Sequence, residues 1–351
     1  MGDVFYLSGN MHNFLKNPDI ILSGIEKSGF YTNIKKNTPV ALKVHFGEKG
    51  NLSHIPPRLI SPLIKALKKM KSKPFLFETN TLYRGERMNA IDHILLARQH
   101  GFGKLNVPII IGDGINGNDY TEAGVYKKHF QSCYLAKALD DIHCMIVLSH
   151  FTGHMLAGFG AALKNIAMGC ASRRGKLAQH ATVGPSINTD QCTKCGICAQ
   201  NCPAETIEQR ETGYFIAGEK CIGCAQCISV CPQGAVKIIW SEATEEIGEK
   251  MMEYAFAVKQ KVKHCLFINF CLFITKECDC MNKEEYGFIN DLGIFISTDP
   301  LSLDKACIDQ ILAQEGRDVI NEIHPDIKYL DYLKYAQKLG IGSLAYNLIR
   351  L

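Results

Sequence analysis

Short apolar runs alternate with amphipathic segments along the first 185 residues. Five runs have the apolar content of strands buried on both faces: residues 4–7, 39–46, 75–77, 107–111 and 142–148. Three segments between them have the period of helices: residues 17–27, 57–71 and 87–100. This alternation predicts an α/β fold, a mostly parallel sheet with flanking helices.

The pattern is interrupted between Ile187 and Trp240, where cysteines become dense and turns dominate. The alternation then resumes, with helical patterns at 242–261, 301–313 and 326–339 and strand-like runs at 266–275 and 292–297. The last part has too few strands to form a sheet alone. We therefore expect one α/β domain, residues 1–186 and 241–351, with a small α+β domain inserted at 187–240. Three serial domains are the alternative.

The inserted segment carries a cysteine repeat. Cys-x2-Cys-x2-Cys-x3-Cys-Pro occurs twice, from Cys192 to Pro203 and from Cys221 to Pro232. Three closely spaced thiolates hold three irons of one cubane, and the fourth cysteine reaches the other cluster. This predicts two [4Fe–4S] clusters with crossed ligands. The first takes Cys192, Cys195, Cys198 and Cys231, and the second takes Cys221, Cys224, Cys227 and Cys202.

Structural zinc is the alternative for these cysteines, but zinc sites usually take paired Cys-x2-Cys knuckles with four ligands per ion. With all eight ligand positions filled, the segment resembles the bacterial two-cluster ferredoxin family. That resemblance implies low-potential, one-electron transfer.

Polar residues follow several of the predicted strands. His45, Arg84 and His150 each come shortly after a strand-like run, and ligand crevices of open α/β sheets lie at the carboxyl ends of strands. His150 and His154 have the spacing of two ligands on one helical face, although Gly153 weakens a helix there. A metal site and ordinary hydrogen-bonding histidines both remain open.

Glycines precede an apolar segment that carries a lysine. Gly158-Phe159-Gly160 is expected to open a helix ending near Met168, with Lys164 one turn inside. A helix that begins after flexible glycines can bind an anion, and Lys164 would then reach it. Close helix packing explains the glycines equally well.

One cysteine pair lies outside the repeat. Cys278 and Cys280 are two residues apart in a polar setting, so on an extended segment both thiols face one side and Asp279 faces the other. They are too close for an unstrained mutual disulfide, but they can share an additional metal ion or a cluster edge. Two buried packing thiols are the alternative. We expect the pair to approach His150 or His154 across a crevice facing the inserted domain.

Five further cysteines and a basic patch are not assigned to a site. Cys133, Cys144, Cys265, Cys271 and Cys307 occur in apolar or helical runs typical of packing residues. Arg173, Arg174 and Lys176 form a compact basic patch that we interpret as a solvated loop.

The polar segments together resemble a family of uncharacterised iron–sulfur centre proteins, domain of unknown function 362. The segments that carry the resemblance are residues 43–51, 79–85, 149–154, 158–169, 278–280 and 291–300. It extends over essentially the whole chain, with the ferredoxin segment inserted as in that family. It implies no particular reaction.

Composition argues against three classes of protein: nucleic-acid-binding, membrane-spanning and exported. The net charge of +4 and the absence of a dense basic run argue against nucleic acid as a partner. No apolar stretch reaches the roughly 18 residues of a membrane span, and the first ten residues lack an export signal. The 16 cysteines suggest metal or redox chemistry in a cytoplasmic protein.

We therefore expect a cytoplasmic iron–sulfur redox protein whose clusters exchange electrons with a site on the α/β domain. An oxidoreductase acting on a small molecule and a non-enzymatic carrier or docking partner of a larger redox complex both fit. The candidate site residues are His45, Arg84, His150, His154, Lys164, Cys278 and Cys280.

Overall fold

The computed structural model describes residues 1–181, 184–239, 244–281 and 286–351. The predicted domain boundary at Trp240 and the expected helix start at residue 242 lie outside the described residues.

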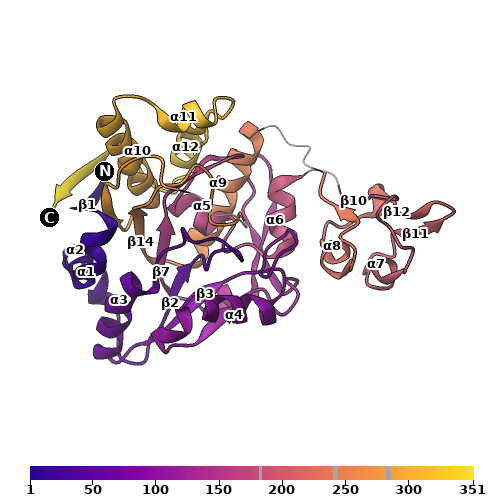
Figure 1. Cartoon of the computed structure of the whole chain (residues 1–351), viewed down its shortest axis with the longest axis horizontal. Helices are drawn as coiled ribbons and strands as arrows, with labels where there is room; N and C mark the ends of the chain where they lie inside the picture. The colour runs from indigo at the N-terminus through magenta and orange to yellow at the C-terminus, as the bar shows by residue number, and fades with distance from the viewer. Residues whose placement is uncertain (182–183, 240–243, 282–285) are drawn as a thin grey trace.

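An eight-stranded sheet forms the centre of the α/β part, in the order β16-β1-β15-β14-β7-β2-β3-β4 (Figure 1). Its strands are β1 (Gly2–Ser8), β2 (Pro39–Val44), β3 (Lys73–Glu78), β4 (Ile109–Ile111), β7 (Cys144–His150), β14 (His264–Cys271), β15 (Gly293–Ser297) and β16 (Tyr346–Arg350). Only β15 runs antiparallel to its neighbours, β1 and β14. The predicted α/β class with a mostly parallel sheet is confirmed.

Side chains alternate between two cores along the central strands. On β7, Met145 and Val147 point into one hydrophobic core, whereas Ile146 and Leu148 point into the other. Both faces of the strand are buried, which explains why its sequence is continuously apolar rather than alternating. The five cysteines predicted to be packing residues are all buried.

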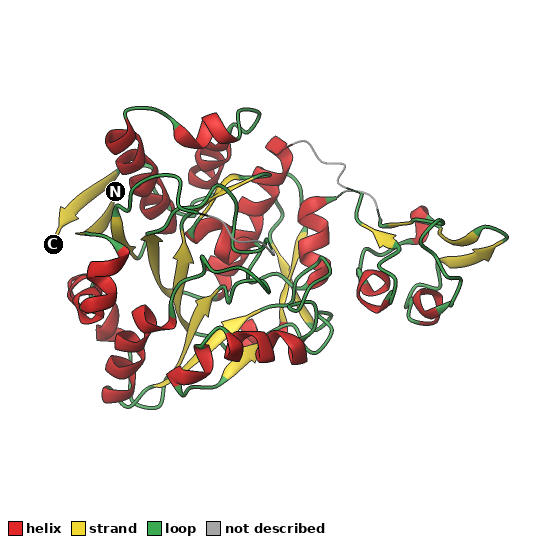
Figure 2. Ribbon diagram, viewed as in Figure 1, coloured by secondary structure: helices red, strands yellow, loops and turns green. Residues whose placement is uncertain are grey.

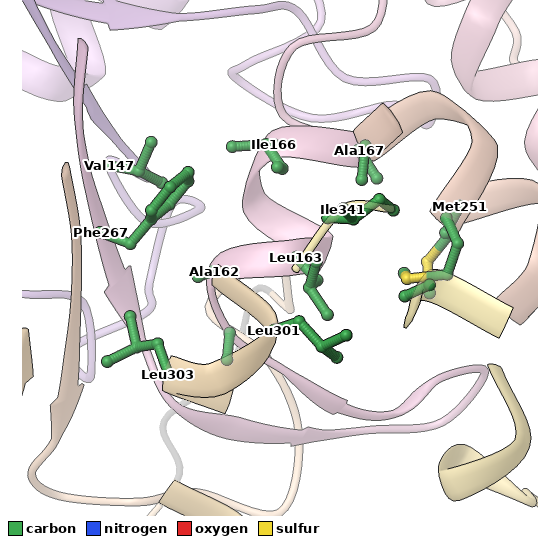
Figure 3. Packing of buried hydrophobic residues seen from close by; sticks show 14 of the residues in the cluster. Val147, Ala162, Leu163, Ile166, Ala167, Met251, Phe267, Leu301, Leu303 and Ile341 are labelled. Carbon is green, nitrogen blue, oxygen red and sulfur yellow. The ribbon is translucent and has the colours of Figure 1, made fainter. Parts of the chain in front are cut away.

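Helices cover both faces of the sheet (Figure 2). One face packs against α1 (Met11–Lys16), α2 (Ile21–Lys27), α3 (Pro57–Lys69) and α4 (Ala90–Gln99). The other packs against α5 (Ala162–Ala167), α9 (Thr244–Lys261), α10 (Pro300–Glu315), α11 (Val319–Ile323) and α12 (Tyr329–Lys338). Figure 3 shows Leu163 and Ile166 of α5 among side chains from several of these elements. No helix in the described ranges is both long enough and apolar enough to cross a membrane.

Strands from both ends of the chain share the sheet. β14 lies parallel to β7, and β16 lies parallel to β1. Segments 1–181 and 244–351 are therefore joined by backbone hydrogen bonds. Two further hairpins, β5 (Tyr120–Gly124) with β6 (Ser132–Ala136) and β8 (Thr152–His154) with β9 (Gly158–Gly160), lie outside the main sheet.

The cysteine-rich segment forms a separate small unit beyond α6 (Arg173–His180), on the right of Figure 1. It contains two short antiparallel strand pairs and two short helices: β10 (Ser186–Ile187) with β13 (Val236–Lys237), β11 (Ile207–Arg210) with β12 (Gly213–Ile216), α7 (Ile197–Gln200) and α8 (Gln226–Val230). We call residues 184–239 the cysteine module.

Two local predictions are wrong. Gly158 does not open a helix, because Gly158–Gly160 pairs with Thr152–His154 and the helix begins only at Ala162. The basic patch is not a solvated loop: it begins α6, and both Arg173 and Lys176 are buried. The long aliphatic stems of these cations allow burial where polar partners receive their charged ends.

Expressed alone, residues 241–351 should show no cooperative thermal transition by circular dichroism. The fragment lacks β7 and β1, which pair with β14 and β16, so backbone groups of both strands would lose their partners. The matched control replaces residues 187–240 of the full chain with a short Gly-Ser linker, and it should unfold cooperatively. A cooperative transition in the isolated fragment would contradict the single-domain arrangement.

Candidate functional site

A pocket of about 160 Å³ lies at the carboxyl ends of β2, β3, β7 and β14. Because these four strands are parallel, the residues that follow them meet at one edge of the sheet. Six of the seven candidate residues line this pocket: His45, His150, His154, Lys164, Cys278 and Cys280. The seventh, Arg84, lies outside it in an adjoining groove that also contains Cys280.

Cys278 and Cys280 lie in a tight turn rather than on an extended segment. The Met281 amide donates to the Cys278 carbonyl at 3.0 Å, and the two Cα atoms are 5.2 Å apart. The structure joins the two sulfur atoms in a disulfide, whereas the sequence favoured two separate thiols. The turn brings both side chains to one side, which an extended backbone would not do at bonding distance.

Asp279, between the two cysteines, is held by His150. The imidazole Nδ1 lies 3.0 Å from both carboxylate oxygens of Asp279, and Nε2 lies 2.9 Å from the Leu272 carbonyl. Since both ring nitrogens face acceptors, His150 is an imidazolium. Burial alone would lower the pKa of His150, but the Asp279 carboxylate outweighs it and raises that pKa. Ser53 donates a further hydrogen bond of 2.7 Å to Asp279.

His150 therefore positions the cysteine turn instead of binding a metal ion. Burial would raise the pKa of Asp279, but the neighbouring His150 charge holds it below its usual value. The pair is thus ionised on both sides, and neither imidazole nitrogen has a free lone pair. His150 and His154 do not share a helical face, because the two residues end β7 and β8.

His154 lies near the cysteine pair, as expected. One ligand atom from each of His154, Cys278 and Cys280 falls within 4.8 Å of the others. However, His154 Nδ1 accepts the Leu156 and Ala157 amides at 3.2 Å, so in the neutral ring Nε2 carries the proton. A metal ion needs an imidazole lone pair and thiolates. The disulfide state therefore does not fit the additional metal ion predicted for Cys278 and Cys280.

His45 has the same tautomer as His154. Its Nδ1 accepts the Gly47 amide at 3.1 Å, which leaves the proton on Nε2. Burial holds the pKa of both imidazoles well below the usual range, and nearby cations lower it further. Both rings are therefore neutral hydrogen-bond donors in the pocket wall.

α5 brings Lys164 to the pocket. The helix is anchored by the buried Asp304 carboxylate, which accepts the Ala162 and Leu163 amides at 3.0 and 2.9 Å. These are orphan donors of the first helical turn, so the carboxylate acts as a cap supplied from α10. Asn269 of β14 donates to the same carboxylate at 2.7 Å. The position of Lys164 is thus fixed from two neighbouring elements.

Buried charges that sequence reasoning did not select complete the wall. Lys43 donates to Glu78 at 2.8 Å and to Asn165 at 2.8 Å. Lys43 and Asn165 lie in the polar segments identified from the sequence, whereas Glu78 does not. A Cβ at Gly169 would lie 2.6 Å from Lys43 Nζ, so glycine leaves room for this buried ammonium.

Arg87 and Lys176 were missed as pocket residues for different reasons. Arg87 lies inside a predicted helix, but α4 begins only at Ala90, so its guanidinium turns inward to Glu48 at 3.3 Å. Lys176 was assigned to solvent, whereas its ammonium donates to Thr79 Oγ1 at 2.6 Å. The carboxylate of Glu78, at the end of a predicted strand, could have indicated that buried cations lie near this edge of the sheet.

In the cysteine module, the two Cys-x2-Cys-x2-Cys loops have matching backbone conformations. Lys194 and Gly196 in the first loop have φ of 58° and 75°, and Gly223 and Ala225 in the second have 66° and 60°. Alternating left-handed residues turn successive amides toward the inside of a loop, which forms a cradle for an anionic group. The two halves of the repeat thus fold into equivalent loops.

The thiols are grouped across the two halves. Cys192, Cys195, Cys198 and Cys231 line one small cavity. Burial raises the pKa of the Cys227 thiol, and the neighbouring thiols of Cys224, Cys221, Cys202 and Cys198 raise that pKa further. The cavity brings together the four cysteines that the spacing assigns to one cluster, and the second ligand set stays a prediction.

The separation of these sulfurs favours a cluster over a single ion. Tetrahedral zinc with Zn–S bonds of ~2.3 Å would hold its sulfurs about 3.8 Å apart. Within the described ranges, no three of the eight cysteines have sulfurs within 4.8 Å of one another. The wider spacing, together with the amide cradles, fits a cubane.

The cysteine module contacts the wall of the pocket. Leu82, which lines the pocket, belongs to one hydrophobic cluster with Cys198, Cys227 and Ile228 of the module. Arg84 lies against Gly234 of the module, where an added Cβ would be 3.0 Å from Nη1. The candidate residue Arg84 therefore contacts the module, and Leu82, which was not among the candidates, belongs to both the pocket lining and the cluster shared with the module.

Comparison with known proteins places the chain in a family. The family model described as "Domain of unknown function (DUF362)" matches residues 40–309, and the chain belongs to this family. A crystal structure of a Thermotoga maritima protein aligns with 88% of this chain and 61% of its own, at 11% identity and a TM-score of 0.43.

Shorter matches link the chain to ferredoxins. A ferredoxin-like protein in the nif region of Sinorhizobium fredii is 42% identical over 52 residues, which are 13% of this chain and 81% of that protein. Pyruvate synthase subunit PorD of Methanocaldococcus jannaschii is 32% identical over 72 residues, 20% of this chain and 84% of that subunit.

Replacing Asp304 with Asn should change how stability depends on pH. Burial raises the pKa of Asp304 to about 7 from an ordinary value of 3.8. Between these values the folded chain holds a proton that the unfolded chain has lost, so this group makes folding less favourable as pH rises. Asp304→Asn removes that dependence.

The urea midpoint of Asp304→Asn, relative to wild type, should therefore increase from pH 5 to pH 8. Asp331→Asn on the exposed surface of α12 serves as the control and should show no such trend. A constant difference between Asp304→Asn and wild type across this pH range would show that Asp304 is ionised throughout.

Proposed function

We propose that this member of the DUF362 family carries electrons through two [4Fe–4S] clusters to or from the pocket on its α/β domain. The observation that carries the proposal is the Cys278–Cys280 disulfide in the pocket wall, next to a cysteine module that contacts the same wall. A disulfide is an acceptor of two electrons, and two clusters of the proposed kind exchange one electron each.

The ligands proposed for the clusters are the crossed cysteine sets. Cys192, Cys195, Cys198 and Cys231 would hold one cluster, and Cys221, Cys224, Cys227 and Cys202 the other. When bound, the clusters supply one-electron transfer at low potential. The similarity to a ferredoxin-like protein over 81% of that protein's length supports this assignment.

The cysteine pair supplies the chemistry of the pocket. Uptake of two electrons and two protons breaks the bond between the Cys278 and Cys280 sulfurs and leaves two thiols, and oxidation reverses both changes. The Lys164 ammonium lines the same wall and can supply a proton, whereas the neutral His154 ring can only donate a hydrogen bond from Nε2. Burial lowers the pKa of Lys164 to about 8, which brings proton release close to neutral pH.

Asp279 and His150 keep the pair in place during this exchange. Their ion pair joins the cysteine turn to the end of β7, and the Asp279 carbonyl accepts the Glu48 amide at 3.0 Å. These contacts hold the backbone of the turn from both sides. The two thiols would therefore stay adjacent after reduction, which favours reclosure of the disulfide.

An external redox protein would exchange electrons with the module. The module lies at the edge of the chain, and Cys195 is exposed. The relative from Methanocaldococcus jannaschii is a pyruvate synthase subunit, which supports a partner within a redox complex. A purely docking role does not explain the disulfide and the buried cations of the pocket. We therefore favour a redox site in the pocket.

Single cysteine replacements should separate the two clusters. Anaerobically purified wild type should contain about eight irons. Cys198→Ala should alter the electron paramagnetic resonance signal of one cluster, and Cys202→Ala should alter the other. Damage to the same cluster by both replacements would contradict the crossed ligand sets.

An anaerobic reductive titration tests the link to the pocket. Oxidised wild type should take up about four electrons from titanium(III) citrate, two at the clusters and two at the disulfide. Cys278→Ser/Cys280→Ser should take up about two and keep both cluster signals. Cys144→Ser, which replaces a buried thiol outside the pocket, serves as the control and should take up about four. Equal uptake by wild type and the double variant would refute the proposal.

A further inference from the structure

The cations of the pocket wall differ in their hydrogen-bond and ion-pair partners. Lys43 is paired with Glu78, and Arg87 is paired with Glu48 behind the wall. Among the residues that the structure describes, no carboxylate lies at bonding distance from Lys176, but its ammonium donates at 2.6 Å to both Thr79 Oγ1 and the Ala171 carbonyl. Each of these buried cations therefore has a defined acceptor inside the protein, as burial of a charge requires.

Lys164 differs from the other cations. Across the described residues, its Nζ has no hydrogen-bond or ion-pair partner, although it borders the pocket. The nearest carboxylates, Glu78 and Asp279, are engaged by Lys43 and by His150. Neighbouring positive charge from Arg87 and Lys43 adds to the cost of burying this ammonium. An anion in the pocket would remove that cost.

Two further groups offer hydrogen-bond donors to the same space. His45 and His154 both line the pocket, and in both the Nδ1 atom accepts backbone amides, which leaves an Nε2–H on each ring. Neither ring can accept a second hydrogen bond at Nε2. A ligand beside them must therefore present acceptors, as a carboxylate oxygen does.

Apolar side chains also line the pocket, and the space is small. Leu82, Ala161 and Met168 line it between the polar groups. The cavity of about 160 Å³ holds several non-hydrogen atoms but no nucleotide. Among the described cations of the wall, Lys164 is the one whose Nζ has no acceptor inside the protein, so it is the charged donor open to the oxygens of a carboxylate.

We propose that the pocket binds a small organic monocarboxylate, with the carboxylate at Lys164 and a short apolar chain against Leu82 and Met168. This inference rests on the proposed function, because it names the substrate class of the same redox site. Donors from His45 and His154 complete the site of the carboxylate. The organic chain then extends along the wall that also holds the Cys278–Cys280 disulfide.

Isothermal titration of the anaerobic full-length protein with propionate, butyrate, propionamide and inorganic phosphate tests this inference. Propionate or butyrate should bind wild type at least tenfold more tightly than propionamide, which has the same shape without the charge. Lys164→Met should weaken carboxylate binding by at least tenfold, and Lys164→Arg should restore part of it. Lys334→Met, in an exposed ion pair on α12, should bind as wild type does.

Three results would overturn the inference: no saturable carboxylate binding to wild type, equal binding to wild type and Lys164→Met, or tighter binding of phosphate than of either acid. Iron content and visible absorbance check that Lys164→Met is intact, and the propionamide comparison needs no variant. Because binding is measured without electron transfer, the outcome is separate from the reductive titration. If carboxylate binding depends on Lys164 but wild type takes up only two electrons, the carboxylate site is supported and the proposed redox role of the disulfide is refuted.

Discussion

Burial of charge at one end of the sheet is the constraint on which the rest of the structure depends. The carboxyl ends of four parallel strands converge there and bring Lys43, Glu78 and His150 into an interior with little water. A buried ion is stable only with a counter-charge or hydrogen bonds. Local structure nearby supplies such partners: Gly169 leaves space for Lys43, and the cysteine turn carries Asp279 to His150.

The same pairing links the pocket to the redox pair. Asp279 is the residue between the two cysteines, so the ion pair that satisfies His150 also fixes where the sulfurs lie. Removing the carboxylate would leave a buried imidazolium without its partner and would free the turn. Stability of the wall and geometry of the disulfide are therefore consequences of one interaction.

The sequence predicted the sheet and the cysteine module well because both have strong periodic or spacing signals. Apolar runs identified β2, β3, β7 and β14, and strand ends then indicated where His45 and His150 meet. The sequence did not predict partners that depend on tertiary contacts. The inward turn of Arg87, the burial of Lys176 and the tautomer of His154 each depend on groups far away along the chain, or on backbone amides that have no sequence pattern. The helix prediction at Gly158 and Gly160 was wrong because glycines are compatible with a hairpin as well as with the start of a helix.

Contact between the module and the pocket wall gives the proposed electron path its physical basis. Leu82 lines the pocket and belongs to a hydrophobic cluster that includes module residues, and Arg84 lies against Gly234 of the module. A module tethered by only two connections would hold no constant distance from the pocket without such packing. The residues after β3 therefore have a second role besides lining the site: they hold the module against it.

An anaerobic crystal structure of the full-length protein after reduction tests the account most directly. We predict anomalous iron density for two cubanes, each held by three cysteines of one repeat and the fourth of the other. In the same crystals the Cys278 and Cys280 sulfurs should be separated to nonbonded distance, with Asp279 still bound to His150. Two reduced clusters beside an intact Cys278–Cys280 disulfide would contradict the account.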